Sequence, residues 1–380
     1  MPRALVILGF VFLSSCSALS DKHHIEDESS SRAEDSVFDP QLSGALQMAL
    51  EEAARIQDAD SISASLYISD HCHWEGATGV TTQEPGTPVE TDMLFSFGSI
   101  TKTLIAAVVL QLAEENVLGL EDTLEQWLEE YPNIDKTITI RQLLNHSSGL
   151  HNYTHAEGFW ADIETDSDRV WLPEELLRYV GLPNSSADIP RYSNTNYILL
   201  GMIIEAATGN PVEQELENRI IGPLNLDSTY LAKDDFDHQR WADNTALSSS
   251  LYSGVWTAGA IASTSRDIAK WSHTLYSGNF LQATSLEQML TAEIGLYGGG
   301  LRIPMGMGVW KVLVEREPAW GHGGWLDQFR AGTFYLPKLE LSVAYSSSGA
   351  RNPRQRRPGS HLVRAYIDNR PDDISVCFDS

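Results

Sequence analysis

Strand patterns occur near both ends of the chain, and helical patterns fill the long stretch between them. Alternating residues at 61–69 predict a strand, residues 71–80 predict its hairpin partner, and strand patterns return at 308–314, 329–335 and 341–346. Strands so far apart in the chain can share one sheet only by pairing across the inserted segment. We therefore expect an α/β (α+β) fold in which an antiparallel sheet is flanked by helices and carries an inserted, mostly helical domain.

Helical periodicity dominates the middle of the chain. The stretch at 101–117 is so apolar that we expect its helix to be buried on most sides. Further helices are predicted at 41–56, 140–145, 173–179, 197–207, 211–221, 266–276, 285–290 and 362–367. A functional cleft is expected where the inserted helices meet the sheet.

The length of 380 residues and a hydrophobic content of 42% allow two domains with a sizeable core. We predict that residues 41–98 and 255–371 form the sheet domain. Residues 99–254 are predicted to form the mostly helical domain, and residues 372–380 a C-terminal tail.

The N-terminus has the layout of a targeting segment. Arg3 is followed by an apolar run and then by small residues, which predicts a signal peptide at residues 1–18. The sequence Leu-Ser-Ser-Cys that ends at Cys16 also resembles a bacterial lipobox, in which the cysteine carries a lipid; ordinary cleavage after residue 18 is the alternative. Residues 19–40 predict a disordered acidic tether. We expect an exported protein, either periplasmic or a membrane-anchored lipoprotein, or alternatively a secreted one.

Charge and cysteine content restrict the partners. The chain has 26 basic and 52 acidic residues and a net charge of −26. Such a surface repels phosphate backbones and anionic headgroups, so we expect no nucleic acid, and a membrane only through a lipid at Cys16. Three cysteines are too few for a disulfide-built scaffold. Cys72 and Cys377 could pair in an oxidising compartment, but the sequence leaves open whether they meet.

Ser99 and Lys102 are the first candidates for catalysis. Lys102 is the only lysine with a serine three residues earlier, and on a helix these two positions share a face. Apolar neighbours reduce the basicity of a lysine, which can then take the proton of a serine that is otherwise a weak nucleophile. The alternative is a helix-capping serine beside a solvated lysine. The chain has no Gly-x-Ser-x-Gly sequence, which argues against a nucleophile-elbow hydrolase.

A second candidate element is Tyr192-Ser193-Asn194. A lysine ammonium nearby would favour the phenolate of Tyr192, which could then act as general base and later as general acid. Asn194 could donate to a substrate carbonyl and accept a hydrogen bond from Lys102. The alternative is a loop tyrosine that caps the next helix.

A third candidate element is His322-Gly323-Gly324, followed by Trp325. Glycines let a backbone approach a ligand closely, and an N–H group just after them could form an oxyanion hole with the N–H of Ser99. The alternative is a flexible turn with a surface histidine.

One further group lies in a loop. His151 and His155 have a zinc-like spacing, but no acidic residue accompanies them as in the helix of a zinc protease. Asn152 and Tyr153 are candidate pocket-lining residues, with a plain loop surface as the alternative.

Together and in this order, the three elements resemble the serine beta-lactamase-related family. This family includes class C beta-lactamases, D-alanyl-D-alanine carboxypeptidases and related serine esterases and aminopeptidases. The resemblance also covers residues 143–150 (LLNHSSGL), 192–209 (YSNTNYILLGMIIEAATG) and 258–267 (AGAIASTSRD). It extends from about residue 41 to residue 370.

The resemblance implies a beta-lactamase/transpeptidase-like fold and a serine hydrolase that acts on an ester or amide through an acyl-enzyme. It implies Ser99 as nucleophile, Lys102 and Tyr192 as proton handlers, and Asn194 as the binder of a substrate amide. The N–H groups of Ser99 and Trp325 would form the oxyanion hole. A small-molecule or cell-wall peptide substrate is implied, with no metal and no cofactor. The alternative is a catalytically silent protein that binds cell-wall peptide or penicillin.

The third element departs from the family pattern. Beta-lactamases of this type carry Lys-Thr-Gly where this chain has His322-Gly323-Gly324. A neutral histidine and a glycine lack the cation and the hydroxyl that hold a substrate carboxylate. This departure favours a neutral ester or amide over strong penicillin turnover. Arg330 could replace the missing cation if it faces the cleft; a solvated arginine on an edge strand is the alternative.

Overall fold

The computed structural model describes residues 38–82, 86–183, 189–234, 236–243, 247–298, 300–352 and 358–371. The predicted signal peptide with Cys16, nearly all of the tether, and the C-terminal tail with Cys377 lie outside these residues. Cys72 is disulfide-bonded, but both other cysteines lie outside the described part, so its pairing with Cys377 stays a prediction. The chain divides at Asp35, and Ser36–Ser380 form one unit, so the split into a sheet domain and a helical domain also stays a prediction.

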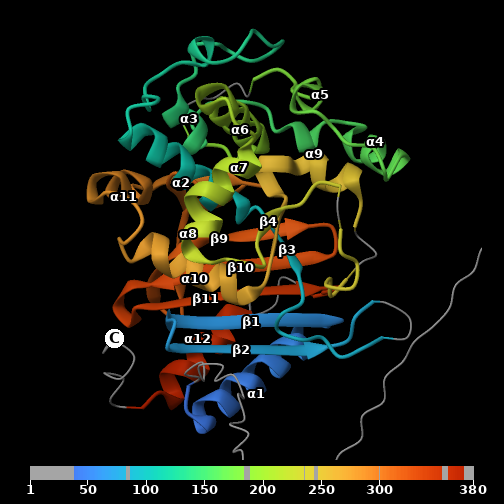
Figure 1. Cartoon of the computed structure of the whole chain (residues 1–380), viewed down its shortest axis with the longest axis vertical. Coiled ribbons are helices and arrows are strands. Elements are labelled where there is room, and N and C mark those ends of the chain that lie inside the picture. Colours follow the sequence, from blue (N-terminus) through green and yellow to red (C-terminus); the bar gives the residue numbers. More distant parts are fainter. Residues whose placement is uncertain are drawn as a thin grey trace, which may run out of the picture. The chain divides into compact units, whose positions relative to one another are not determined.

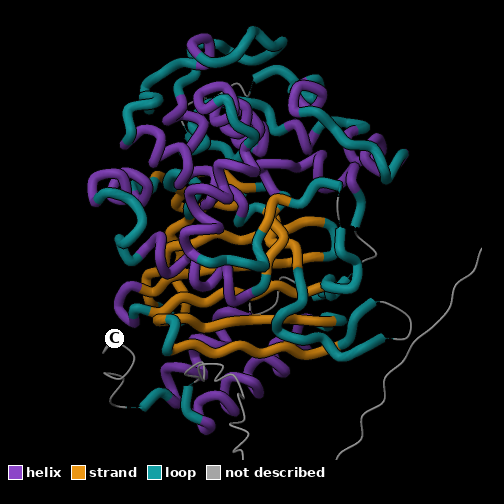
Figure 2. Tube along the Cα trace, viewed as in Figure 1, coloured by secondary structure: helices purple, strands orange, loops and turns teal. Residues whose placement is uncertain are grey.

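The two ends of the folded unit build one eight-stranded antiparallel sheet, as predicted (Figures 1 and 2). The predicted hairpin is β1 (Ser61–Ser69) and β2 (Cys72–Gly79), and β1 pairs along its length with β11 (Leu341–Ser348). The strand order is β2-β1-β11-β10-β9-β8-β7-β6. The other strands are β6 (Glu293–Tyr297), β7 (Leu301–Met305), β8 (Trp310–Val314), β9 (Glu317–Leu326) and β10 (Phe329–Leu336).

Helices cover both faces of this sheet. The apolar positions of β1, such as Ile62 and Leu66, belong to one apolar cluster with α1 (Pro40–Gln57) and α12 (Pro358–Asn369). The alternate positions face α10 (Ser265–Tyr276), where Tyr67 packs edge-on against His273 at 5.5 Å between ring centroids. The alternation in β1 thus serves two buried surfaces.

The inserted part is mainly helical and lies next to the β9–β10 region of the sheet (Figure 1). Its central helix α2 (Thr101–Glu114) is buried over most of its length, as predicted, and contacts α6 (Asn194–Thr208) and α9 (Ser249–Gly259). The other helices are α3 (Ile140–Leu144), α4 (Phe159–Thr165), α5 (Pro173–Leu177), α7 (Val212–Leu216), α8 (Gly222–Leu224) and α11 (Ala283–Leu290). None of the helices in the described residues is long and apolar enough to span a membrane.

Short elements account for most differences from the predictions. A second sheet, with the order β3-β5-β4, consists of β3 (Phe95–Gly98), β5 (Ile261–Ser263) and β4 (Tyr230–Leu231). These strands are too short to show an alternating pattern. Within the helix predicted at 211–221, the α-helical part ends at Leu216, and Glu217–Ile221 form a π-helical turn.

Candidate active site

Ser99 lies in the turn that joins β3 to α2. Ile100 is the N-cap of α2, and the backbone N–H of Lys102 donates to the carbonyl of Ser99 at 3.1 Å. This tight turn brings Nζ of Lys102 to 3.1 Å from Oγ of Ser99, so the contact predicted from the spacing is present. Ser99 is partly exposed, whereas Lys102 is fully buried. A ligand could therefore reach the hydroxyl but not the amine.

Lys102 is buried without an acidic partner. Nζ donates to the carbonyl of Ala258 as well as to Ser99, and no carboxylate of the described residues forms an ion pair with it. Its Nζ lies 5.0 Å from the centroid of the Tyr192 ring. Burial lowers the pKa of Lys102 well below its usual value, which favours the neutral amine. The alternative of a solvated lysine is wrong.

Tyr192 is held against the edge of the sheet. Its N–H donates to the carbonyl of Leu296 in β6 at 2.9 Å, and the N–H of Leu296 donates to Pro190 at 2.8 Å. The ring packs against His146, at 4.5 Å between centroids, and edge-on against Tyr297 at 5.0 Å. The segment before α6 thus extends the sheet by one short pairing beyond β6.

The protonation expected for Tyr192 is wrong. Burial raises the pKa of the phenol well above its usual value, and an interaction with Ser99 acts in the opposite direction. Burial also lowers the pKa of Lys102, so the ammonium that was expected to favour the phenolate is disfavoured. Both shifts favour a neutral phenol beside a neutral amine. Tyr192 is then ready to give a proton, and Lys102 is ready to take one.

Asn194, the first residue of α6, also differs from the prediction. Its Nδ2 donates to Oγ1 of Thr154 at 3.1 Å, and its backbone N–H donates to Oδ1 of Asn152 at 3.1 Å. The expected hydrogen bond from Lys102 is absent, since Nζ is engaged by other acceptors. Oδ1 of Asn194 is buried without a partner among the described residues. The unpartnered Oδ1 can accept from a substrate N–H, and the second N–H of Nδ2 can still donate to a substrate carbonyl.

The glycines of the third element allow two strands to approach closely. A Cβ on Gly324 would lie 2.0 Å from the carbonyl oxygen of Phe97, and a Cβ on Gly98 would lie 2.7 Å from the nitrogen of Trp325. Gly98 also has a φ of +51°, which side chains disfavour. The N–H of Trp325 therefore lies beside the turn that carries Ser99. The alternative of a flexible turn is wrong, because the segment belongs to β9.

His322 is buried, so the alternative of a surface histidine is wrong. Its Nδ1 lies 2.6 Å from the carbonyl oxygen of Gly323, which can only accept, so Nδ1 carries the proton. Burial, and then the charge that Lys102 carries when it is protonated, lower the pKa of His322 to about 3. The ring packs against Trp310 at 4.0 Å between centroids, with the two planes tilted by 32°, and Gly323 lies beside the same indole. His322 supplies no cation at neutral pH.

We expect this buried histidine to make the fold sensitive to acid. The unfolded chain takes up a proton near pH 6.5 and the folded chain only near pH 3, so protonation favours unfolding between these values. The free energy of unfolding should therefore fall by roughly 3 kcal/mol between pH 7 and pH 4 through this group alone. Denaturant unfolding of the wild type and of His322→Gln over this range measures the effect. The same pH dependence in both proteins would contradict it.

Arg330 and Trp325 lie at the rim of the site. Trp325 is 64% exposed, and the guanidinium of Arg330 stacks over its indole at 4.0 Å. Arg330 belongs to β10, which lies between β9 and β11, so the alternative of an edge-strand position is wrong. Nη1 of Arg330 donates to the carbonyls of Asp327 and Phe329.

The loop candidates are divided between a pocket and the core. Asn152 lines a pocket beside Tyr192, together with His151 and His155, whereas Tyr153 is fully buried in the hydrophobic core. Arg191 also lines this pocket and was not among the residues predicted from the sequence. The signal available was its position directly before the tyrosine of the second element. The described residues contain no group of three or more His, Cys, Asp and Glu placed to hold a metal ion.

Comparisons with known proteins agree with this geometry. The beta-lactamase family model matches residues 48–366. Penicillin-binding protein 4* of Bacillus subtilis (strain 168) is 27% identical over 271 residues, which cover 63% of this chain and 57% of that protein. Esterase EstB of Burkholderia gladioli is 30% identical over 163 residues, which cover 40% and 41% of the two chains. This chain spans a little over half the length of the first curated relatives it matches.

Solved structures extend the similarity over the fold. A D-stereospecific amidohydrolase from Streptomyces sp. has a TM-score of 0.68 and 27% identity, covering 85% of this chain and 98% of that chain. The D-amino acid amidase from Ochrobactrum anthropi SV3 has a TM-score of 0.75 and 21% identity, covering 86% and 99%. The arrangement of the sheet and the helices is therefore shared with amide-cleaving proteins.

Proposed function

The chain belongs to the beta-lactamase family, and from this premise we propose that it is a serine hydrolase that cleaves an ester or amide through an acyl-enzyme. The observation that carries the proposal is the 3.1 Å contact between Oγ of Ser99 and Nζ of Lys102, an amine that is fully buried and has no carboxylate partner among the described residues. A structural lysine in such a place would be costly, because burial disfavours its charge. A neutral amine beside a partly exposed hydroxyl suits proton transfer.

In the first step, the neutral amine of Lys102 takes the proton of Ser99 while Oγ attacks the substrate carbonyl. The carbonyl oxygen becomes an oxyanion, which the N–H groups of Ser99 and Trp325 stabilise. The close approach of Gly324 to Phe97 supports this pairing of donors, since it places the two backbone segments side by side.

In the second step, the bond to the leaving group breaks. Tyr192 gives its proton to the leaving group, and the ammonium of Lys102 returns a proton to Tyr192, so the enzyme groups regain their starting state. A water then attacks the acyl-enzyme. Its proton passes to Tyr192 as Tyr192 gives its own proton to Lys102, and Lys102 returns a proton to Oγ of Ser99, which regenerates the free serine. The raised pKa of Tyr192 supports the acid role, because the phenol remains protonated at neutral pH.

Asn194 is proposed to hold the substrate through its unpartnered Oδ1, which would accept from an N–H group near the cleaved bond. An amide or an acylated amino acid ester provides such a group. Similar proteins include a D-aminopeptidase from Brucella anthropi, 26% identical over 289 residues. We therefore propose small D-amino acid esters and amides as the first substrates to test.

A labelling experiment tests the function. A fluorophosphonate probe should form one covalent adduct, and peptide mass spectrometry should locate it on Ser99. A panel of a p-nitrophenyl ester, a D-amino acid amide, a D-Ala-D-Ala peptide and a chromogenic cephalosporin then identifies the bond that is cleaved. An adduct on another residue contradicts the proposal. Binding of cell-wall peptide without a burst on activated esters would instead support a catalytically silent binding protein.

We also propose that the protein is exported. The pattern of residues 1–18 supports this, and so does the disulfide at Cys72, because disulfides persist in oxidising compartments. Mass spectrometry of the mature N-terminus tests the anchor: a lipid-modified Cys16 indicates a lipoprotein, and a chain that begins after residue 18 indicates secretion.

A further inference from the structure

Beside Tyr192 lies a pocket of about 220 Å³ that the steps above do not use. This volume is below the roughly 300–1,000 Å³ of sites that enclose a whole drug-sized ligand, so the pocket suits one group of a substrate. Three distant segments line it, around residues 151–155, at 191–192 and at the end of β6. Its polar side chains are His151, Asn152, His155, Arg191, Tyr192 and Tyr297.

The hydrogen bonds of Asn152 fix the orientation of its amide. Oδ1 accepts from the backbone N–H of Asn194 and from Oγ1 of Thr154, both at 3.1 Å. Nδ2 must therefore be the donor in the 3.2 Å contact with Nε2 of His155. In the neutral form, His155 then carries its proton on Nδ1. Each of these two side chains keeps an N–H group as its outward hydrogen-bonding function.

The other side chains have the same character. Nδ1 of His151 accepts from the N–H of Gly181 at 3.2 Å, so the neutral ring carries its proton on Nε2. The guanidinium of Arg191 has only donors and a permanent charge. The backbone of Arg191 is fixed on both sides, because its N–H donates to the carbonyl of His146 at 2.9 Å and the residue is bridged to β6.

Among the described residues, the lining of the pocket differs in charge from the chain as a whole. Acidic residues outnumber basic residues by 52 to 26 in the sequence, yet none of the described residues that line this pocket is an aspartate or glutamate. A site with one guanidinium and several N–H donors fits a group that only accepts hydrogen bonds and carries a negative charge. A carboxylate is such a group, and arginine binds it with two parallel hydrogen bonds.

We propose that this pocket binds a carboxylate of the substrate, with Arg191 as its anchor; the proposal rests on the hydrolase function above. The pocket would supply the cation that the third element lacks, since His322 stays neutral. Tyr192 is both a wall of the pocket and the proposed proton donor to the leaving group. A group in the pocket therefore adjoins the leaving side of the cleaved bond, so we assign the carboxylate to the leaving group.

Matched thioesters test this assignment. N-acetyl-D-alanyl thioglycolate releases a thiol with a carboxylate, and its N-methylamide analogue releases a neutral thiol of similar size. The wild type should prefer the charged thioester by about 10- to 100-fold in kcat/KM, the range expected of a charged hydrogen-bonded contact. Arg191→Gln should reduce this ratio to about one, and Arg191→Lys should give an intermediate ratio, because lysine keeps the charge but loses the bidentate geometry.

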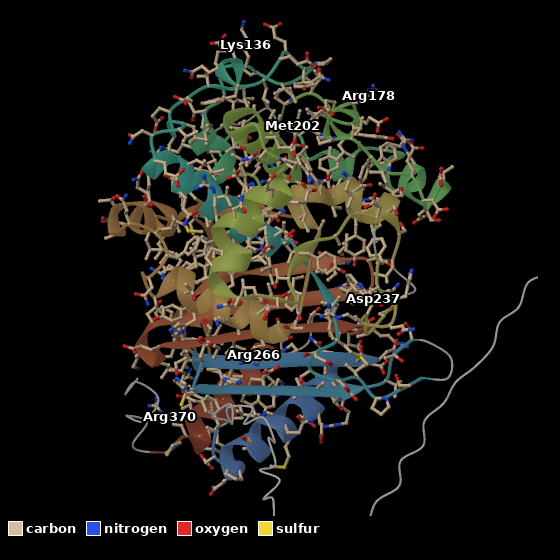
Figure 3. The ribbon with its side chains drawn as sticks, in the orientation of Figure 1. Lys136, Arg178, Met202, Asp237, Arg266 and Arg370 are labelled. Atoms are coloured by element: carbon tan, nitrogen blue, oxygen red, sulfur yellow. The ribbon has the colours of Figure 1, made fainter. Side chains whose placement is uncertain are left out.

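The control is Arg370→Gln. Arg370 is exposed next to α12 and lies far from the inserted helices in Figure 3. The Arg370→Gln substitution removes the same charge from the chain and should leave the ratio of kcat/KM for the two thioesters unchanged. Thermal unfolding of each variant shows whether it is folded, and competitive inhibition by free thioglycolate gives a second measurement, with a Ki that rises in Arg191→Gln only.

The outcomes separate the pocket from the hydrolase function. Equal rates for both thioesters in an active wild type would overturn the carboxylate proposal and leave the hydrolase intact. The absence of turnover and of a Ser99 adduct would overturn the hydrolase function itself. A matched pair with the carboxylate in the acyl group, a succinyl thioester and its N-methylamide, tests the side: an Arg191-dependent preference there would overturn the assignment to the leaving group.

Discussion

Replacement of Ser99 by alanine is expected to lower kcat on the best ester or amide substrate by a factor on the order of 10⁴ to 10⁶, the range seen when the nucleophile of a cooperating catalytic set is removed. The change deletes one oxygen that accepts from Lys102 and is partly exposed, so the fold should be little affected. Steady-state kinetics of Ser99→Ala, together with loss of the fluorophosphonate adduct, measure the effect.

A neighbouring serine serves as the control. Ser96 belongs to β3, three residues before Ser99, and is fully buried. Ser96→Ala removes the same atom from the same segment outside the reacting groups and should retain activity within a few fold. Residual activity of Ser99→Ala above about one-tenth of the wild type would mean that another residue is the nucleophile.

Lys102 gives the second large expected effect. Lys102→Met keeps the length of the side chain but removes the proton acceptor, and we expect kcat to fall roughly 10²- to 10⁴-fold. Because the amine is fully buried and lacks a carboxylate partner among the described residues, its removal should leave stability equal or higher. Kinetics and denaturant unfolding of the same preparation measure both quantities.

Lys102→Arg distinguishes a proton acceptor from a fixed positive charge. Arginine remains charged, so it cannot take the proton of Ser99, and an unpaired charge in this position should cost about 3–5 kcal/mol. We expect loss of both activity and stability. Retention of activity in Lys102→Arg would show that the site needs a cation and would overturn the proton-acceptor role.

The pH profile of the wild type follows from the same two groups. Lys102 is active as the neutral amine, so kcat/KM should rise with pH through its lowered pKa, below the usual 10.5. Tyr192 is active as the phenol, and its pKa is raised above 10, so no alkaline decline from this group is expected below pH 10. A bell-shaped profile centred near neutral pH whose alkaline limb is lost in Tyr192→Phe would contradict this assignment.

The sequence predicted the parts of the fold that leave a local pattern. The alternation in 61–69 reflects two buried faces with different neighbours, and the strong apolarity of 101–117 reflects a helix buried on most sides. The spacing of Ser99 and Lys102 predicted their contact because one turn of chain suffices to form it. Each of these features depends on residues that are close together in the sequence.

The features that the sequence did not predict depend on distant segments. His322 is buried because β9 lies inside the sheet, and its glycines serve strand contact rather than a turn. The direction of the pKa shift of Tyr192 depends on its burial between β6 and α6, which no local pattern shows. Arg191, His151 and His155 line one pocket only because the segments at 151–155 and 191–192 meet the end of β6, and no local pattern shows that these segments meet.

The backbone hydrogen bonds of Pro190 and Tyr192 with Leu296 connect the proposed proton donor to the edge of the sheet. β6 is the outermost strand, and its first two residues, Glu293 and Ile294, are exposed, so we expect this edge of the sheet to open first on warming. Its detachment would carry the phenol away from the nucleophile while the central strands remain folded. Loss of activity on heating should therefore precede global unfolding, and a cross-link between β6 and β7 should raise the temperature at which activity is lost.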